Sequence, residues 1–282
     1  MKRLRPAALA LVLLAALAAL YYQRETAVRV ETVRHRSALL GREVAYKVLL
    51  PPGYGLVTSR ATRYPVLYML HGWGGDHESW LSSSSLALYA SEHRLIVVTP
   101  EGGKGWYTDA AAAGERYESY VLRELIPEVD GRFRTVAARR GRGVAGYSMG
   151  GYGALKFGFR HPEVFAFAGS TSGALDAAAR EDEESLVRTF GGGGSPTRAE
   201  NDLPRLAREF PEARRGALPY LYLDCGLEDP WLAHNRDFAA ALAERRIAHE
   251  YRQLPGRHVW PYWDARARDI LRVASEMLVA PE

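Results

Sequence analysis

Short apolar runs alternate along the chain with longer helix-like stretches. The apolar runs predict strands at residues 44–50, 66–70, 95–99, 142–146, 165–170 and 220–224, and a weaker one at 249–254. Helices are predicted between them at 116–129, 149–160, 231–246 and 264–278. Several strand runs are apolar throughout, which is typical of strands buried on both faces. The pattern indicates an α/β fold with a mostly parallel central sheet and helices on both faces.

Two segments depart from this alternation. Residues 26–34 and 42–50 are both strand-like, and we expect them to form an antiparallel hairpin at the edge of the sheet. Residues 173–218 hold an acidic run and four consecutive glycines, and we interpret them as a lid-like insertion with short helices. The glycines predict a flexible loop rather than a phosphate cradle, because no Lys-Ser or Lys-Thr pair follows them. We therefore interpret residues 26–282 as a single domain.

Residues 1–25 differ in composition from the rest. Three basic residues within the first five precede fourteen Ala, Leu and Val residues at 7–20, and the first acidic residue is Glu25. A basic head before a short apolar run is the layout of a secretory signal. A membrane span needs about 20 residues, but the flanking Tyr21 and Tyr22 keep an uncleaved anchor as an alternative. We expect an exported protein, periplasmic or extracellular, that contacts a membrane only through this segment.

Composition and charge exclude several classes of protein and of binding site. The chain has 282 residues, of which 47% are apolar and 25% charged, and this excludes wholesale disorder and a polytopic membrane protein. The formal net charge is +4, but residues 23–282 carry only +1, so the basic balance is no evidence for nucleic acid. A lone cysteine, Cys225, excludes an intramolecular disulfide and a Cys-based metal site. No cluster of His, Asp and Glu has ligand spacing, and we expect neither metal nor cofactor.

A Gly-x-Ser-x-Gly segment joins the strand predicted at 142–146 to the next helix. Its serine is Ser148, between Gly146 and Gly150. At such a turn the hydroxyl is exposed at the tip, and side chains in place of the glycines would collide with neighbouring backbone. The N–H groups that begin the helix favour negative charge on the serine oxygen. We interpret Ser148 as a nucleophile; the alternative is an ordinary glycine-rich turn.

A serine hydroxyl needs a general base, which this architecture places in a loop after a late strand. Four histidines follow the serine. His161 precedes a proline at a helix end and is interpreted as a C-terminal cap. His234 falls within a predicted helix and His249 at the start of a strand. His258 lies in a loop between the last strand and the last helix, so we predict that it is the base.

The carboxylate that orients the base is expected after the strand at 220–224. Asp229, in the turn into the next helix, is the favoured candidate. Asp before Pro is also a common N-cap arrangement, so Asp229 has a purely structural alternative. Glu228 is the rival acid, and Asp224 is a poorer one because it lies at the strand end.

Two backbone N–H groups are needed to bind an oxyanion. One is expected from Met149, the residue after the serine. The other is expected from the glycine-rich loop at 70–75, where we assign Trp73, with Gly74 as the alternative. His71 and Asp76 are expected to hold this loop rather than to take part in the chemistry.

At these segments the chain resembles the esterase D-like branch of the α/β-hydrolases, over about residues 40–278. The branch includes S-formylglutathione hydrolases, tributyrin-type, feruloyl and acetylxylan esterases, and mycolyltransferases. The matching segments are LHGWGG at 70–75, GWYTD at 105–109, YESY at 117–120, ELIP at 124–127, GYSMGG at 146–151, CGLED at 225–229 and GRHVWPYW at 256–263. The resemblance implies the α/β-hydrolase fold.

The resemblance also implies site residues. These are a triad of Ser148, Asp229 and His258, with oxyanion donors at Trp73 and Met149. One departure is Arg257, where the family usually has a second glycine before the histidine, and we expect the pocket rim to differ there. The export-type leader argues against the cytosolic detoxification role of the S-formylglutathione members.

The primary functional hypothesis is a serine carboxylester hydrolase that works through an acyl-enzyme. Its expected partner is a small-molecule or carbohydrate ester with a short-chain, aromatic or sugar-linked acyl group. We expect Trp106, Tyr107 and Trp231, with Trp73, to crowd the mouth and bind aromatic acyl groups or sugar rings; the alternative is that these aromatic residues only pack the lid. An acyltransferase of the mycolyltransferase type shares the first half-reaction and is the alternative. The alternative that is not an enzyme is a non-catalytic binding module.

Overall fold

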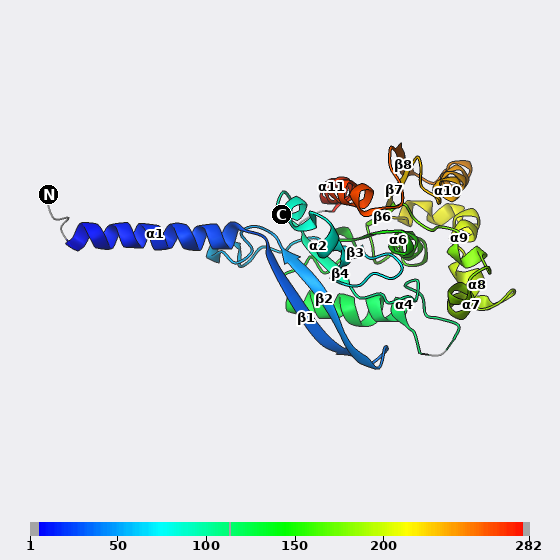
Figure 1. The fold of residues 1–282 in the computed structure, drawn as a ribbon, viewed down its shortest axis with the longest axis horizontal. Coiled ribbons are helices and arrows are strands. Elements are labelled where there is room, and N and C mark those ends of the chain that lie inside the picture. The colour runs from blue at the N-terminus through cyan, green and yellow to red at the C-terminus, as the bar shows by residue number, and fades with distance from the viewer. Residues whose placement is uncertain (1–5, 113, 279–282) are drawn as a thin grey trace.

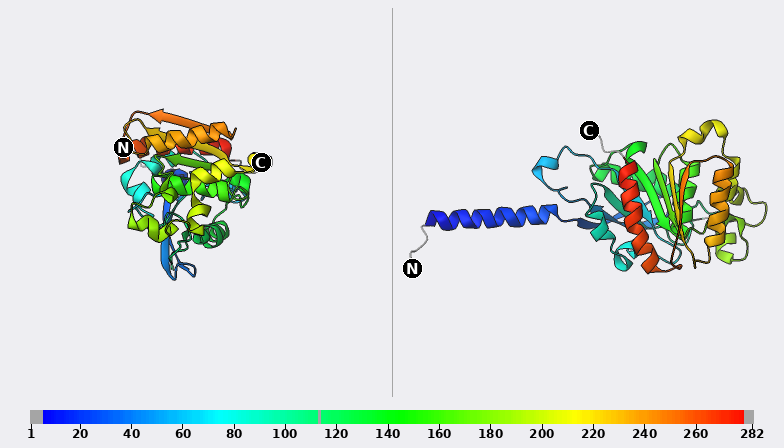
Figure 2. Two further views of the ribbon diagram at one scale, coloured as in Figure 1. Left: turned by 90° about the vertical axis from the view of Figure 1, so that its right-hand side faces the viewer. Right: turned by 90° about the horizontal axis from the view of Figure 1, so that it is seen from above.

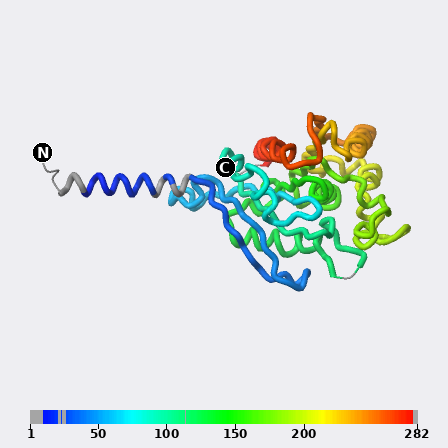
Figure 3. The backbone as a smooth tube through the Cα atoms, viewed as in Figure 1, coloured from blue at the N-terminus to red at the C-terminus, as the bar shows by residue number. Residues whose placement is uncertain are grey.

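The computed structural model describes residues 6–112 and 114–278, without the side chains of 6–9, 21, 22 and 24–26 (Figure 1 and Figure 3). Its strands are β1 (Arg29–Ser37), β2 (Arg42–Leu50), β3 (Val66–Leu70), β4 (Ile96–Pro100), β5 (Arg142–Tyr147), β6 (Phe167–Thr171), β7 (Tyr220–Gly226) and β8 (His249–Leu254). Within the described residues they form one sheet of eight strands in the order β1-β2-β4-β3-β5-β6-β7-β8. β2 pairs antiparallel with β1 and β4, and all later pairs are parallel.

Helices and helical turns connect the strands. The helices are α1 (Pro6–Thr26), α2 (Ser79–Ser83), α3 (Leu86–Ala90), α4 (Tyr117–Tyr120), α5 (Ile126–Arg132), α6 (Met149–Arg160), α7 (Glu184–Phe190), α8 (Pro196–Asn201), α9 (Leu203–Glu209), α10 (Leu232–Glu244) and α11 (Trp260–Met277). The shorter turns are η1 (Val57–Ser59), η2 (Val121–Leu125), η3 (Arg139–Gly141), η4 (Ala177–Ala179) and η5 (Glu212–Ala217).

Apolar side chains fill a core on each face of the sheet. Successive residues of β5 point to opposite faces, so Val144 lies in one core and Ala145 in the other. Leu155 of α6 belongs to the first core, whereas Ile270 of α11 belongs to the second. Figure 2 shows α11, in red, lying across its face of the sheet. The predicted α/β architecture, with strands buried on both faces, is confirmed.

Most predicted elements occur with limits shifted by a few residues. The helix expected at 116–129 is a continuous run of α4, the π-helical turn η2 and α5. The edge hairpin forms, but β1 runs over Arg29–Ser37 because α1 continues to Thr26. The last helix begins at Trp260, before the predicted residue 264, because Pro261 fits a first helical turn and Trp263 packs into the second core.

The segment at 173–218 contains η4, α7, α8, α9 and η5. Figure 1 shows α7, α8 and α9 gathered along one side of the molecule, beside the end of the sheet that carries the loops described below. Apolar residues of these helices, including Phe190 and Leu203, are buried in the first core. The glycine run at 191–194 follows α7 as a loop.

Helix α1 extends away from the rest of the chain (Figure 1 and Figure 2). Its described aliphatic side chains are exposed: Leu11, Val12, Leu13, Leu14, Leu17 and Leu20. The basic residues of the expected leader, at 1–5, lie outside the described residues. A search of the described residues finds no helix with both the length and the apolarity to cross a bilayer.

Candidate active site

Ser148 occupies the tight turn between β5 and α6. Its backbone has φ 54° and ψ −119°, a strained conformation for a residue with a side chain. A Cβ on Gly146 would lie 2.5 Å from the carbonyl carbon of Gly150, and a Cβ on Gly150 would overlap the carbonyl oxygen of Leu70. Backbone contacts therefore require both glycines of the motif.

The structure brings together three predicted residues from separate loops. Nε2 of His258 lies 3.0 Å from Oγ of Ser148. Nδ1 of the same ring lies 3.0 Å from Oδ2 and 3.3 Å from Oδ1 of Asp229. A carboxylate only accepts hydrogen bonds, so Nδ1 carries the ring proton and Nε2 accepts from the serine hydroxyl. This is the hydrogen-bond order of a nucleophile, a base and an orienting acid.

Asp229 faces the histidine and is not the N-cap that the structural alternative expected, because α10 begins at Leu232 with Trp231 as its N-cap. Its Oδ1 accepts a 2.9 Å hydrogen bond from the backbone N–H of Trp231, just before α10. Burial raises the pKa of Asp229, but the hydrogen bonds from His258 and from Trp231 outweigh burial and hold the pKa below its ordinary value. The carboxylate is therefore charged at neutral pH.

The two rival acids have other partners. Glu228 is exposed and pairs with Arg257 at 2.8 Å. Asp224 is fully buried and accepts hydrogen bonds from Thr171 Oγ1 at 2.6 Å and Tyr262 Oη at 2.8 Å. Burial raises the pKa of Asp224 to about 6. The hydrogen bonds that His258 makes to carboxylates, among the described residues, go to Asp229.

One predicted oxyanion donor follows the serine in the chain, and the other lies in a loop that passes beside it. Met149 is the first residue of α6, where a backbone N–H has no acceptor within the helix. A Cβ on Gly72 would lie 3.2 Å from Cβ of Ser148, so the loop that carries Trp73 runs directly beside the nucleophile. In the described part of the chain, neither the Met149 nor the Trp73 N–H has a backbone acceptor. Both donors are thus available to a ligand.

The loop after β3 is held by its own polar side chains. The His71 ring hydrogen-bonds the Gly72 carbonyl through Nδ1 at 2.8 Å and accepts the Gly102 N–H at Nε2 at 2.9 Å. Asp76 accepts the backbone N–H of Glu78 at 2.9 Å. Burial lowers the pKa of His71, which stays neutral in this position. Both side chains hold the loop in the way the sequence predicted.

Aromatic rings enclose the imidazole. Trp263 meets the His258 ring edge-on, with ring centres 4.9 Å apart, and Trp231 lies on another side at 6.4 Å. Trp263 also stacks on Tyr147, the residue before the serine, at 4.4 Å. The sequence analysis assigned no role to Trp263. The feature that could have indicated one is the group of aromatic residues that follows His258 in the chain.

Two of the residues expected at the mouth are elsewhere. Tyr107 is fully buried, and Trp106 is only 5% exposed, with its ring packed edge-on against Tyr152 at 5.7 Å. Their expected place at the mouth is therefore wrong, because the Trp106 ring packs against Phe190 of the 173–218 segment and the Tyr107 ring is enclosed beside α6. Trp73, by contrast, is 52% exposed, and Trp231 is partly exposed.

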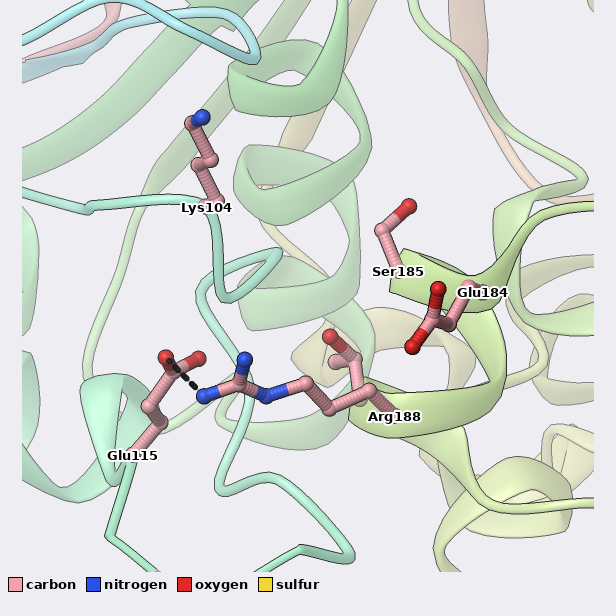
Figure 4. A pocket seen from close by; sticks show the side chains of 6 residues that line it. Lys104, Glu115, Glu184, Ser185 and Arg188 are labelled. Carbon is pink, nitrogen blue, oxygen red and sulfur yellow. Dashed lines mark hydrogen bonds and ion pairs between the residues drawn. The ribbon is translucent and has the colours of Figure 1, made fainter.

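A cavity lined by charged and hydroxyl-bearing side chains lies beside α7. It has a volume of about 330 Å³ and is lined by Lys104, Glu115, Glu184, Ser185, Arg188 and Thr189. Figure 4 shows Arg188 of α7 reaching across it to Glu115, at 3.4 Å. Nζ of Lys104 lies 4.8 Å from the centre of the Trp73 ring. Lys104 thus lines the cavity and also contacts the ring of Trp73.

Sequence reasoning missed a buried ionic cluster beneath the site. Lys156 of α6 is fully buried, and its Nζ lies 2.7 Å from Oε2 of Glu118. Oε1 of Glu118 accepts from Arg160 at 2.8 Å and pairs with Nε2 of His161, the predicted helix cap, at 2.7 Å. Burial raises the pKa of Glu118, but the Lys156 ammonium and the His161 hydrogen bond hold it well below its ordinary range. A lysine among the apolar residues of α6 was the available signal.

The described residues include no group of three or more His, Cys, Asp or Glu side chains arranged to hold a metal ion. What the site offers chemically is a serine oxygen within hydrogen-bond distance of an imidazole nitrogen, with the N–H of Met149 at the start of the adjoining helix and the loop of Trp73 beside it. That set of groups suits attack on a carbonyl carbon and stabilisation of the resulting oxyanion.

The chain is similar in sequence to proteins named as esterases. An esterase of Mycobacterium tuberculosis is 34% identical over 256 residues, covering 80% of this chain and 55% of its own length. The chain thus spans about half the length of the curated relatives it matches first. An acetyl esterase of Caldicellulosiruptor saccharolyticus is 27% identical over 209 residues, covering 70% of this chain and 78% of its own length.

Solved structures show the same fold. The fluorophosphonate-binding serine hydrolase F of Staphylococcus aureus superposes with a TM-score of 0.80 at 27% identity, over 88% of this chain and 99% of its own. The model of the family described as "Putative esterase" matches residues 37–272. The chain has the α/β-hydrolase fold and belongs to the putative esterase family.

Proposed function

We propose that the protein is a serine carboxylester hydrolase with Ser148, His258 and Asp229 as its catalytic triad. The observation that supports this most strongly is the hydrogen-bonded sequence Asp229–His258–Ser148, with both links at 3.0 Å. Oγ of Ser148 attacks the ester carbonyl carbon while Nε2 of His258 takes the hydroxyl proton. The carbonyl oxygen becomes an oxyanion that accepts hydrogen bonds from the N–H groups of Trp73 and Met149.

Collapse of this tetrahedral intermediate expels the alcohol. The protonated His258 gives its proton to the leaving alkoxide, and the acyl group remains on Ser148. A water molecule then attacks the acyl carbon and passes a proton to Nε2 of His258, which returns it to Oγ of Ser148 as the acid leaves. Throughout, Asp229 holds the imidazole tautomer and stabilises the imidazolium.

The direct test is Ser148→Ala assayed on p-nitrophenyl acetate, with Ser91→Ala as an exposed serine control outside the site. We expect Ser148→Ala to lose at least about 10³-fold in kcat and all labelling by a fluorophosphonate probe. Ser91→Ala should keep both. Full activity in Ser148→Ala would refute the proposed mechanism.

For the substrate, we propose a small ester whose non-reacting part is aromatic or carbohydrate. The exposed Trp73 ring offers a stacking surface next to the oxyanion donors, and the charged cavity beside it offers donors and acceptors for hydroxyl groups. One similar protein is named an acetyl esterase, which is consistent with a short acyl group. Comparing kcat/KM for p-nitrophenyl acyl esters, a feruloyl ester and acetylated xylan identifies the class.

We further propose that residues 1–25 direct export and that the catalytic domain acts outside the cytoplasm. The exposed aliphatic side chains of α1 support a role in a membrane or in the export machinery. Fractionation of cells that express the full chain tests this, and the mass of the recovered protein distinguishes a cleaved signal from a retained anchor. Full-length protein confined to the cytosol would contradict it.

A further inference from the structure

The buried Tyr107 phenol is bonded to the backbone that leads into the oxyanion loop. Its hydroxyl accepts the backbone N–H of His71 at 2.9 Å and donates to the carbonyl oxygen of the same residue at 3.1 Å. Burial raises the pKa of Tyr107 well above its ordinary value, so the phenol keeps its proton and makes both bonds. One hydroxyl thus satisfies both backbone groups of the first residue after β3.

The phenol itself is held firmly. Tyr107 has φ 51°, a left-handed conformation that needs support in a residue with a side chain. Its carbonyl oxygen accepts a 2.6 Å hydrogen bond from Nζ of Lys156, which is paired in turn with Glu118. Its ring fills the space that side chains at Gly102 and Gly153 would occupy. The buried ionic cluster therefore fixes the tyrosine on α6, the helix that begins at Met149.

The backbone that the phenol holds leads directly to the proposed donor. His71 is followed by Gly72, whose Cα lies against Ser148, and then by Trp73. The side chain of Trp73 is exposed, so its ring packing does little to fix the position of its N–H. Asp76 holds the far end of this loop, so the stretch before Trp73 depends on the beginning of the loop, where Tyr107 and the His71 ring bind it.

We infer that Tyr107 is a positioning residue for the oxyanion hole: it links the oxyanion loop, through its hydroxyl, to the helix that carries the second donor. The inference rests on the proposed function, since it assumes that the Trp73 and Met149 N–H groups bind the oxyanion. Donors that are fixed before reaction stabilise the transition state more than the bound ester, because the negative charge develops only there.

Tyr107→Phe tests the inference, and Tyr152→Phe is its matched control. Tyr152 is another fully buried tyrosine, and its hydroxyl donates to the Asn201 carbonyl at 2.6 Å, away from the oxyanion loop. We expect Tyr107→Phe to lower kcat about 10- to 100-fold and to leave KM within about twofold. Tyr152→Phe is expected to change neither by more than about twofold, even if both variants unfold at a lower temperature.

Inhibition by phenylboronic acid supplies a readout that a purely structural role would not change. Its tetrahedral adduct with Ser148 places an oxygen in the oxyanion hole, so its affinity should fall in Tyr107→Phe in proportion to kcat/KM. If Tyr107→Phe is insoluble, Gly102→Ala is the second variant, since the added Cβ would displace the Tyr107 ring. The same selective loss of kcat is expected.

Failure of the positioning role can be distinguished from failure of the proposed function. If the wild type depends on Ser148 but Tyr107→Phe matches Tyr152→Phe in kcat and in boronate affinity, the positioning role is refuted and the proposed function stands. If Ser148→Ala keeps wild-type activity, the proposed function fails first, and the positioning role fails with it.

Discussion

Oδ2 of Asp229 lies 3.0 Å from Nδ1 of His258, while the neighbouring Glu228 points to Arg257. Two adjacent carboxylates on one turn thus have different partners. The buried one faces the imidazole, and the exposed one forms a surface ion pair. Exposed ion pairs contribute little to stability, whereas a carboxylate behind a catalytic imidazole sets its tautomer.

The first prediction concerns this pair of carboxylates. Asp229→Asn is expected to lower kcat about 10³- to 10⁴-fold, because an amide allows the wrong imidazole tautomer. Glu228→Gln is expected to stay within about threefold, since surface substitutions have small effects. Initial rates on p-nitrophenyl acetate measure both. The reverse order of losses would assign the acid to Glu228.

The second prediction concerns the pH dependence of stability. The pKa of Asp224 is raised from 3.8 to about 6 in the folded state, so the folded state holds this proton more tightly than the unfolded state. Its stabilising contribution is present below about pH 4 and is lost as the pH rises through 6. Asp224→Asn removes this loss of stability at high pH, because an amide does not titrate. Its oxygen can still accept the hydrogen bonds from Thr171 and Tyr262.

The free energy of unfolding of Asp224→Asn, relative to wild type, is therefore expected to rise by roughly 2.5 kcal/mol between pH 4 and pH 7. Urea unfolding at both pH values measures it. Asp237→Asn, at an exposed position, serves as the control, and its difference from wild type should stay nearly constant. If the difference in unfolding free energy between Asp224→Asn and wild type were the same at both pH values, the pKa of the Asp224 carboxyl would not be raised by folding.

A third prediction follows from the space around two glycines. Gly150→Ala is expected to destabilise the protein by more than about 2 kcal/mol and to abolish activity, because the new Cβ would overlap backbone oxygens of residues 70 and 71. Gly131→Ala in α5, where the added methyl would have open space, should instead stabilise by roughly 0.5–1 kcal/mol. Thermal unfolding with a parallel rate assay checks both. A stable, active Gly150→Ala would show that the turn tolerates a side chain.

The fourth prediction concerns the buried ion pair. Lys156→Met leaves one oxygen of Glu118 without its cation, and is expected to cost about 3–5 kcal/mol of unfolding free energy. Adding Glu118→Gln should recover part of that loss, because an amide costs less to bury than an uncompensated carboxylate. A double-mutant cycle from urea unfolding gives the coupling. Additive losses would mean that the two side chains act independently.

Local sequence patterns predicted much of this fold. The helix at 149–160 has the same limits in the structure as α6, since the Gly-x-Ser-x-Gly turn starts it and His161 before Pro162 ends it. Apolar runs predicted the buried strands because burial on both faces excludes polar residues. The start of α11 was missed because its first turn is aromatic, and its burial depends on Tyr147, more than a hundred residues away in the chain.

The sequence by itself determined the Gly-x-Ser-x-Gly turn and the chain order of the proposed serine, acid and base, because both depend on short-range backbone geometry and strand order. Only the tertiary structure decided that Asp229, and not Glu228, hydrogen-bonds the imidazole, since adjacent side chains point in different directions and meet partners distant in sequence. The tertiary structure also places Tyr107 in the interior, whereas the sequence analysis expected it at the mouth of the site. An aromatic residue beside glycines suits either place, and only the packing of α6 and the oxyanion loop around its ring selects one.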